Sequence, residues 1–290
     1  MLKANISDDQ RGVTNLYIFS GHLYTGVALI SVSLFWLMKY CCYTQRNGYQ
    51  RQRQGGSILY KLIELVPWEG SLLLFCGLTA LGRVVTTPLF RIKMVANDGN
   101  FQFDSLFGWQ HVVLSSCVVL FGVFIILADT KCNELVVYVK PVGSFTFAIF
   151  GTVFVLHAIM KDPVDSQVHN VLTFCSYGMA ISFALETAYP EQAIYFILRI
   201  FFAFLQGTFW IQAAYILEPP NGQPWDGYDK LNVMFVSTSF LIQCLIAFWI
   251  VLLMFFGMNK ISQKIKKKEY TYLQNEIEMS LEKQENKIGG

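Results

Sequence analysis

Charged residues are scarce in this sequence. Only 14% of its 290 residues are Asp, Glu, Lys or Arg, whereas 54% are hydrophobic. A soluble domain carries about 25% charged residues, so this composition does not fit a water-exposed surface. The formal net charge is only +2, and the basic residues form no continuous stripe, which indicates that there is no nucleic-acid partner. The composition therefore predicts an integral membrane protein.

The sequence also lacks the cysteine pattern of an extracellular disulfide framework. It has seven cysteines, at positions 41, 42, 76, 117, 132, 175 and 244, and none falls in a segment that we place outside the membrane on its outer face. We interpret them as small core hydrophobes or reduced thiols. Cys41 and Cys42 end the first apolar run, where palmitoylation is an alternative to two unmodified interfacial thiols.

Seven apolar runs are long enough to cross a bilayer. About 20 helical residues span the roughly 30 Å of hydrocarbon, and helices satisfy their own backbone amides within it. The runs cover residues 16–42, 58–85, 109–128, 135–160, 168–188, 193–217 and 232–258. We therefore predict an all-α fold, a polytopic membrane helical bundle with seven transmembrane helices. The first run is longer than that of a cleaved signal peptide, so we expect it to be retained as an anchor.

The predicted spans divide the chain into a short outer N-terminus (1–15), the seven-helix domain (16–258) and a charged tail (259–290). With the N-terminus outside, more Lys and Arg residues lie in the inner segments than in the outer ones, and a run of lysines from Lys264 to Lys268 follows the last helix. This is the bias of cytosolic segments, and the anionic inner leaflet attracts such lysines. We predict a multi-pass protein of the plasma membrane or an endomembrane, with its C-terminus in the cytosol. The tail alternates Lys and Glu, which is typical of an exposed helix or of disorder.

All four histidines lie where an apolar run meets a polar segment. They are His22, His111, His157 and His169. The last two flank the connection H-A-I-M-K-D-P-V-D-S-Q-V-H, and the predicted topology places all four on the outer side. Three or four imidazoles with a carboxylate suit Zn²⁺ or Fe. We therefore predict a metal site formed by the four histidines, with Asp162 or Asp165 as the oxygen donor.

The histidines permit other interpretations. Zinc beside Ser115 would polarise an ester or amide carbonyl, or activate a bound water. Two imidazoles from facing helices would instead hold a haem between them. Histidine is also amphipathic, so each imidazole fits the membrane interface as a structural residue that is hydrogen-bonded to its neighbours.

A second polar group lies nearer the predicted cytosolic side. Arg199 lies within an apolar run, at a cost of at least about 2.5 kcal/mol if it has no partner. We predict that it pairs with Glu186 or Glu69, mainly as a structural ion pair; Glu64 lies close to Glu69 in sequence. One turn of helix separates Gln206 from Trp210, so both point inward, to form an interhelical hydrogen bond or to line a lipid or sterol cavity.

Several local patterns together resemble the transmembrane protein 45 family. They are Gly21-His22, Trp109-Gln110-His111, His157 to His169 with Pro163 and Asp165, Leu185-Glu186, Gln206-Gly207-Thr208 with Gln212, Pro219-Pro220, Trp225-Asp226, Asn232 and Met234-Phe235. The resemblance runs from about Gly21 to Met258. Where the family has His-x-His pairs, this chain keeps one histidine of each pair, with Ile159 and Gln167 in the other positions. The resemblance implies a multi-pass membrane protein without a settled biochemical activity.

Three functions follow from these observations. The first is a membrane enzyme with a metal centre on the outer or lumenal side that acts on a lipid or other amphiphile. The second is a non-enzymatic scaffold, trafficking or lipid-binding protein, and the third is a haem-binding redox protein. The expected partners are the lipid bilayer, a lipid ligand and cytosolic proteins that bind the tail. The layout is like that of G-protein-coupled receptors, but the sequence has neither a D-R-Y nor an N-P-x-x-Y stretch.

Overall fold

The computed structural model describes residues 8–46, 67–86, 92–95, 98–159, 161–220, 223 and 225–288. This part of the chain contains seven helices that are long and apolar enough to cross a membrane. They are α1 (Asp8–Arg46), α3 (Trp68–Thr86), α4 (Phe103–Thr130), α5 (Val139–Ala158, preceded by the 3₁₀ turn Asn133–Tyr138), α6 (Pro163–Ala188), α7 (Ala193–Leu217) and α8 (Lys230–Ile288). The prediction of an all-helical membrane bundle with seven spans is confirmed.

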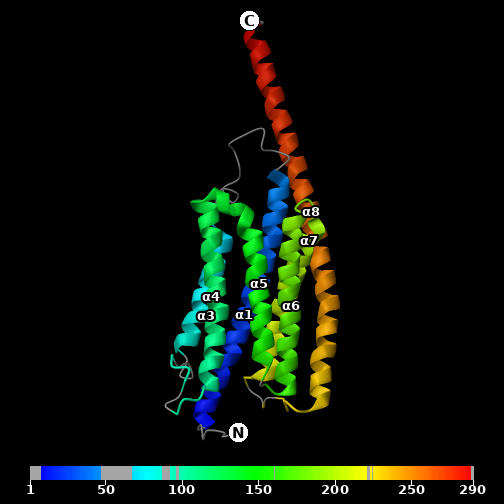
Figure 1. Ribbon diagram of the computed structural model, residues 1–290. Coiled ribbons are helices and arrows are strands. Elements are labelled where there is room, and N and C mark those ends of the chain that lie inside the picture. Colours follow the sequence, from blue (N-terminus) through cyan, green and yellow to red (C-terminus); the bar gives the residue numbers. More distant parts are fainter. Residues whose placement is uncertain are drawn as a thin grey trace.

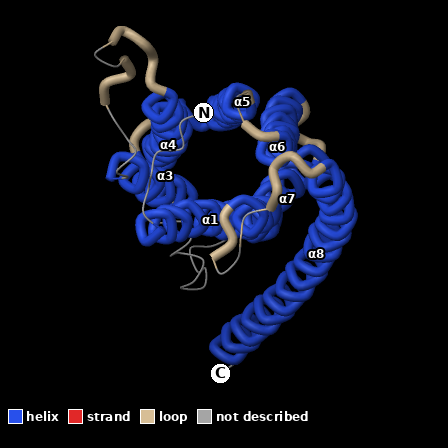
Figure 2. Tube along the Cα trace, turned by 90° about the horizontal axis from the view of Figure 1, so that it is seen from below, coloured by secondary structure: helices blue, strands red, loops and turns tan. Residues whose placement is uncertain are grey.

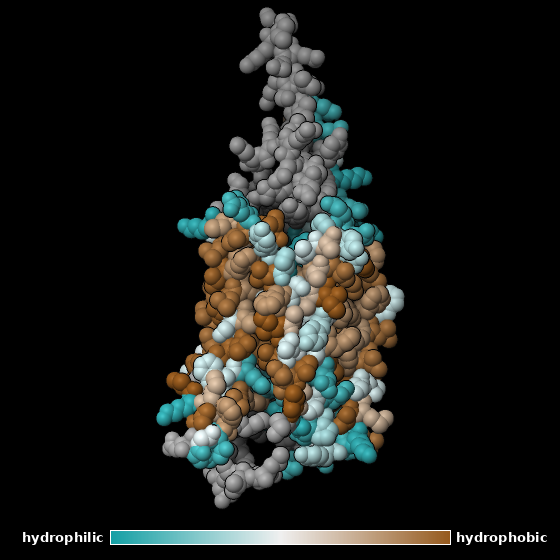
Figure 3. Space-filling model, in the orientation of Figure 1, coloured by the Kyte–Doolittle hydropathy of each residue, from teal (hydrophilic) through white to brown (hydrophobic). Residues whose placement is uncertain are grey.

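The helices run along one common direction, and the N- and C-termini lie at opposite ends of the bundle (Figure 1). Viewed along this direction, α1, α3, α4, α5, α6 and α7 form a ring, and α8 lies outside it against α6 and α7 (Figure 2). Apolar side chains cover the middle of the face in Figure 3, and hydrophilic residues lie above and below them. An apolar belt between two polar ends is the surface expected of a protein that lies in a bilayer.

Several helix boundaries differ from those expected. α6 begins at Pro163 and not near Val168, because the Asp162 side chain caps the helix by accepting from the backbone N–H of Asp165 at 2.9 Å. Proline is favoured in the first turn, where no intrahelical partner exists for its missing N–H. The connection between α5 and α6 therefore covers only residues 159–162, and His157 and His169 both lie on helices.

The two terminal helices extend beyond the predicted spans. α1 begins at Asp8 although its apolar part covers Phe19–Tyr40, and α8 continues to Ile288 although its apolar part ends at Ile261. Lys and Glu are good helix formers, so the tail continues the helix although its sequence has no apolar face. The expected start of the second span, at residues 58–66, lies outside the described part of the chain, as do Glu64 and the side chains of Cys41 and Cys42.

Glycines allow neighbouring helices of the ring to approach closely. A Cβ atom on Gly26 of α1 would lie only 2.6 Å from the carbonyl oxygen of Gly207 on α7, and one on Gly207 would lie 2.8 Å from the carbonyl oxygen of Gly26. Gly70 and Gly122 form the same kind of contact between α3 and α4. Small residues are the usual means of close packing in lipid, where the hydrophobic effect does not drive helices together. These contacts hold α1 close to α7 and α3 close to α4 within the ring.

Candidate functional site

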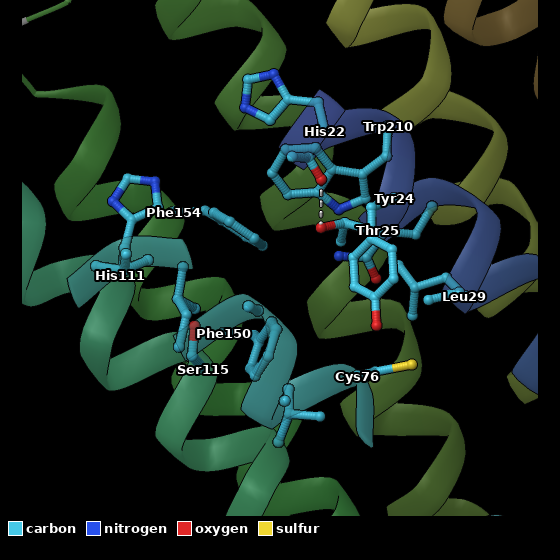
Figure 4. Close-up of a pocket in the computed structure, with 18 of the residues that line it drawn as sticks. His22, Tyr24, Thr25, Leu29, Cys76, His111, Ser115, Phe150, Phe154 and Trp210 are labelled. Carbon is cyan, nitrogen blue, oxygen red and sulfur yellow. Dashed lines mark hydrogen bonds between the residues drawn. The ribbon is translucent and has the colours of Figure 1, made fainter. Parts of the chain in front are cut away.

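A cavity of about 350 Å³ lies within the ring of helices. All six ring helices contribute to its lining, which is mostly apolar (Figure 4). Its histidines and charged residues gather toward the end of the bundle that carries the α5–α6 connection. The histidines, Lys161, Asp165 and Glu218 lie at this end, and Leu73, Phe121 and Phe147 lie deeper. Such a cavity has distinct polar and apolar regions.

All four predicted histidines line this cavity. The ring centroids of His111 and His157 are 4.9 Å apart, and those of His157 and His169 are 4.5 Å apart. His22 comes from α1 and packs against Trp210 of α7, with ring centroids 5.0 Å apart. Figure 4 shows the His22 and His111 rings at the same end of the cavity. The structure therefore joins three of the histidines in one contact chain and places the fourth on another wall.

Hydrogen bonds determine which nitrogen of each clustered imidazole carries the proton. The Nδ1 atoms of His111 and His169 lie 3.0 and 2.8 Å from the backbone carbonyls of Phe107 and Asp165, one turn earlier on the same helix. A carbonyl only accepts, so each Nδ1 donates. In a neutral imidazole, the Nε2 atom is then left as an acceptor.

His157 makes the equivalent bond to a side chain on another helix. Its Nδ1 lies 2.7 Å from Oε1 of Gln110 on α4, and an amide oxygen also only accepts. Phe107 packs against His157 with ring centroids 4.3 Å apart, which restricts the imidazole further. The three clustered histidines therefore share one arrangement, in which Nδ1 donates and, where the imidazole is neutral, Nε2 is left as an acceptor.

Asp165 is the carboxylate of this cluster. Its Oδ2 accepts from Lys161 Nζ at 2.8 Å, and its Oδ1 lies 2.9 Å from Nδ1 of His169. It lies in the first turn of α6, where the helix dipole favours a negative charge. Lys161 also lies over the Phe107 ring, 4.6 Å from its centroid. Asp165 thus lies beside the histidines, whereas Asp162 caps α6 and is not part of the cavity lining. A role for either as an oxygen donor to a metal stays a prediction.

A metal site also requires that several ligand side chains converge on one position. Among the residues that the structure describes, no three or more His, Cys, Asp or Glu side chains are arranged to hold one metal ion. Ser115 lines the cavity with the histidines, as the zinc hypothesis expected. The binding of zinc, iron or haem by these residues stays a prediction.

Sequence reasoning missed three charged residues of the lining, namely Arg83, Glu218 and Lys161, the partner of Asp165. Arg83, in the last turn of α3, donates to the Ser20 hydroxyl at 2.6 Å. Glu218 follows the last residue of α7, and burial together with the nearby Asp165 carboxylate raises its pKa to about 7. A basic residue inside an apolar run was the available signal for Arg83. Glu218 follows its run and has no comparable signal, because it comes near Asp165 only through the tertiary structure.

The second polar group is a separate ion-pair network away from the cavity. Arg199 Nε donates to Glu186 Oε2 at 2.8 Å, and Lys140 Nζ lies 3.1 Å from Glu186 Oε1. The guanidinium lies 4.3 and 4.7 Å from the ring centroids of Trp36 and Phe183. The predicted pairing of Arg199 with Glu186 is confirmed.

Glu69 has other partners. It accepts from Lys39 Nζ at 2.6 Å and from the Trp36 indole N–H at 2.8 Å. The expected interhelical bond of Gln206 is also present, because its amide donates to Ser176 Oγ at 2.9 Å while Gln206 and Trp210 both line the cavity. Gln206 is therefore both a helix-to-helix contact and a lining residue, while a lipid or sterol in the cavity stays a prediction.

Comparison with known proteins matches residues 138–256 to a family of unknown function (DUF716). Transmembrane epididymal protein 1 of Rattus norvegicus is 26% identical over 175 residues, or 59% of this chain and 55% of the relative. Transmembrane epididymal protein 1A of Mus musculus is 26% identical over 135 residues, 46% of this chain and 44% of the relative. The Homo sapiens transmembrane epididymal protein 1 is 23% identical over 135 residues, 46% of this chain and 49% of the relative.

The chain spans about half the length of these curated relatives. The family match includes His157, His169 and the Arg199–Glu186 pair, whereas His22 and His111 precede it. It covers less of the chain than the sequence resemblance to the transmembrane protein 45 family. The chain is thus an integral multi-pass membrane protein that is similar to transmembrane epididymal protein 1, and residues 138–256 of the chain match a family of unknown function (DUF716).

Proposed function

We propose that this protein binds a membrane amphiphile inside its helix bundle. The polar headgroup lies among the histidines, and the apolar body extends toward Phe121 and Phe147. The observation that carries this proposal is the cavity itself, because its histidines and charged side chains gather at one end while the rest of its lining is mostly apolar. Binding pockets of this kind combine apolar walls with a few placed polar groups.

The headgroup contacts must supply most of the selectivity. An amphiphile in a bilayer already has its tail in hydrocarbon, so moving the tail into the cavity gains little from the hydrophobic effect. Hydrogen bonds made away from water, and the shape of the aromatic walls, are the remaining favourable terms. The histidine cluster is therefore the part of the site that distinguishes one amphiphile from another.

A metal is the second candidate for the same end of the cavity. The Nδ1 contacts of His111, His157 and His169 leave Nε2 of each imidazole as the atom that would bind zinc or iron. With a metal, the amphiphile would be a substrate, as the enzyme hypothesis expects. Cytosolic partners of the tail (259–290) stay a separate prediction.

Cavity-filling substitution is the test of amphiphile binding. The purified full chain in nanodiscs is irradiated with a long-chain alcohol that carries a diazirine in its chain and an alkyne at its end. We expect labelled peptides to contain lining residues, and Leu114→Trp to reduce labelling at least about tenfold because the indole fills the cavity. Val113→Trp is the matched control, since Val113 is the preceding residue of α4 and is 43% exposed on the outside of the bundle. Labelling confined to the outer surface and unchanged by Leu114→Trp would disprove the proposal.

We further propose that the N-terminus and the histidine end of the cavity face the outer or lumenal side. The lysines that follow the apolar part of α8 support this orientation, because they lie at the other end of the bundle (Figure 1). A tag after Gly290 is expected to react with antibody only in permeabilised cells. A tag before Met1 is expected to be exposed on intact cells, or protected inside sealed vesicles if the protein resides in an endomembrane. The reverse pattern would place the histidine end in the cytosol.

A further inference from the structure

We infer that the headgroup of the bound amphiphile is an uncharged hydroxyl, which donates its hydrogen to the histidine cluster. The ligand is then a single-chain or ring-bearing alcohol of the membrane, and not a phospholipid or a fatty acid. This inference rests on the proposed function, and it adds the chemical class of the ligand.

The first argument is the hydrogen-bonding character of the cluster. The Nδ1 atoms of His111, His157 and His169 face acceptor oxygens 2.7 to 3.0 Å away and therefore donate to them. In the neutral imidazole, Nε2 is then an acceptor, and the three rings contact one another. Acceptors in a site of low polarity need a donor, and leaving them without one costs free energy. A hydroxyl supplies a donor without bringing a charge.

The second argument is the balance of charge at this end of the cavity. An anionic headgroup would meet the carboxylates of Asp165 and Glu218, and a cationic one would meet Lys161 and Arg83. Asp165 and Lys161 already neutralise each other at 2.8 Å. Burial and the nearby Asp165 carboxylate raise the pKa of Glu218 to about 7, so this region disfavours a further negative charge. Neither sign of headgroup charge has an advantage, whereas a neutral group avoids the desolvation cost that a charge would bear.

The third argument is size and shape. About 350 Å³ is at the lower end of the range for cavities that hold drug-sized ligands, so there is space for one compact or single-chain molecule. Phe150, Phe154 and Trp210 form walls next to the cluster, and Phe154 and Trp210 are in edge contact with centroids 5.8 Å apart. Such rigid walls suit one alkyl chain or a ring system better than two acyl chains.

The test uses four photoreactive probes with the same alkyl chain and different headgroups. The headgroups are a hydroxyl, its methyl ether, a carboxylate and an ammonium. The full chain is held in nanodiscs of neutral phospholipid, and labelling of cavity peptides is measured by mass spectrometry. We expect the hydroxyl probe to label roughly 3- to 10-fold more efficiently than the methyl ether, because the ether accepts a hydrogen bond but cannot donate one. The two charged probes are expected to label less than the hydroxyl probe.

Substitution of the acceptor provides an independent comparison. His157→Phe keeps a ring of similar shape and removes the Nε2 acceptor, so it should lower labelling by the hydroxyl probe and leave labelling by the ether unchanged. His111→Phe is the second variant, and a thermal melt of each variant checks its folding. The comparison of the probes on the unsubstituted protein does not depend on either variant.

Each other outcome identifies which statement fails. Equal cavity labelling by the hydroxyl and ether probes would overturn the hydroxyl assignment and leave amphiphile binding standing. Preferred labelling by the carboxylate or ammonium probe would overturn it in favour of a charged headgroup. No cavity labelling by any probe would overturn the proposed function itself. Stoichiometric zinc or iron in the purified protein, lost in His157→Phe, would assign the Nε2 atoms to a metal and overturn the hydroxyl assignment.

Discussion

Arg199→Leu is expected to destabilise the folded protein by about 3–5 kcal/mol, the usual cost of breaking a buried ion pair from one side. Arg199 and Glu186 are both buried, and their side chains meet at 2.8 Å. Leucine also removes a guanidinium that lies over Trp36 and Phe183, and a cation–π contact away from water contributes about 2 kcal/mol. Thermal unfolding in nanodiscs measures the change in stability.

A second substitution identifies the partner. In the Arg199→Leu background, Glu186→Gln should recover much of the lost stability, because it removes the carboxylate that has lost its main partner. Glu69→Gln is the matched control and should give no recovery, since Glu69 pairs with Lys39 at 2.6 Å and with the Trp36 indole. Lys140 stays near Glu186 in every variant and is partly exposed, so it makes the rescue less than complete. An unchanged melting temperature for Arg199→Leu alone would show that the pair does not stabilise the fold.

Gly26→Ala is expected to destabilise the bundle by about 3 kcal/mol, at the upper end of the usual cost of overpacking. The new Cβ would lie 2.6 Å from the carbonyl oxygen of Gly207 and 2.7 Å from Cγ1 of Ile211. A side chain can change its rotamer, but the Gly207 carbonyl belongs to the backbone of α7. Relief of the clash therefore requires α1 and α7 to move apart, with loss of contacts along both helices.

Gly82→Ala is the control for Gly26→Ala. Gly82 also lies in a transmembrane helix, α3, and a Cβ there has no atom within 4 Å. Alanine is favoured over glycine inside a helix by about 1 kcal/mol, so this change should be neutral or slightly stabilising. The two substitutions are chemically identical, and thermal unfolding of both variants should show opposite effects. Similar melting temperatures for the two variants would mean that the α1–α7 contact is not as close as the structure has it.

The spans were predictable from sequence because the bilayer acts on each segment separately. The sixth predicted span, 193–217, has the same bounds as α7, and each of the other runs overlaps one of the observed transmembrane helices. Errors occurred at the ends, where local capping is stronger than hydropathy. Asp162 and Pro163 begin α6 within a segment that is too polar to resemble a span.

The sequence predicted that Arg199 has a carboxylate partner, but it did not show which one. An isolated charge in hydrocarbon is costly, so Arg199 was expected to have a carboxylate partner. The sequence alone gave no reason to prefer Glu186 over Glu69. Only the packing of α7 against α6, and of α3 near Lys39 of α1, separates the two. Which helices become neighbours depends on how side chains that are far apart in the chain pack together. A single sequence does not show which of these side chains are in contact.

The same division applies to the candidate site. Sequence by itself determined that four histidines end their apolar runs on one side of a seven-helix membrane protein, because span lengths and their alternation follow from hydropathy. Only the tertiary structure decided that they line one cavity and that Gln110 of α4 orients His157 of α5. It also brought Glu218 near Asp165. The physical reason is that a segment inserts into the bilayer according to its own composition. A binding site depends instead on the distances between side chains from different helices, and only the packing of the helices establishes these distances.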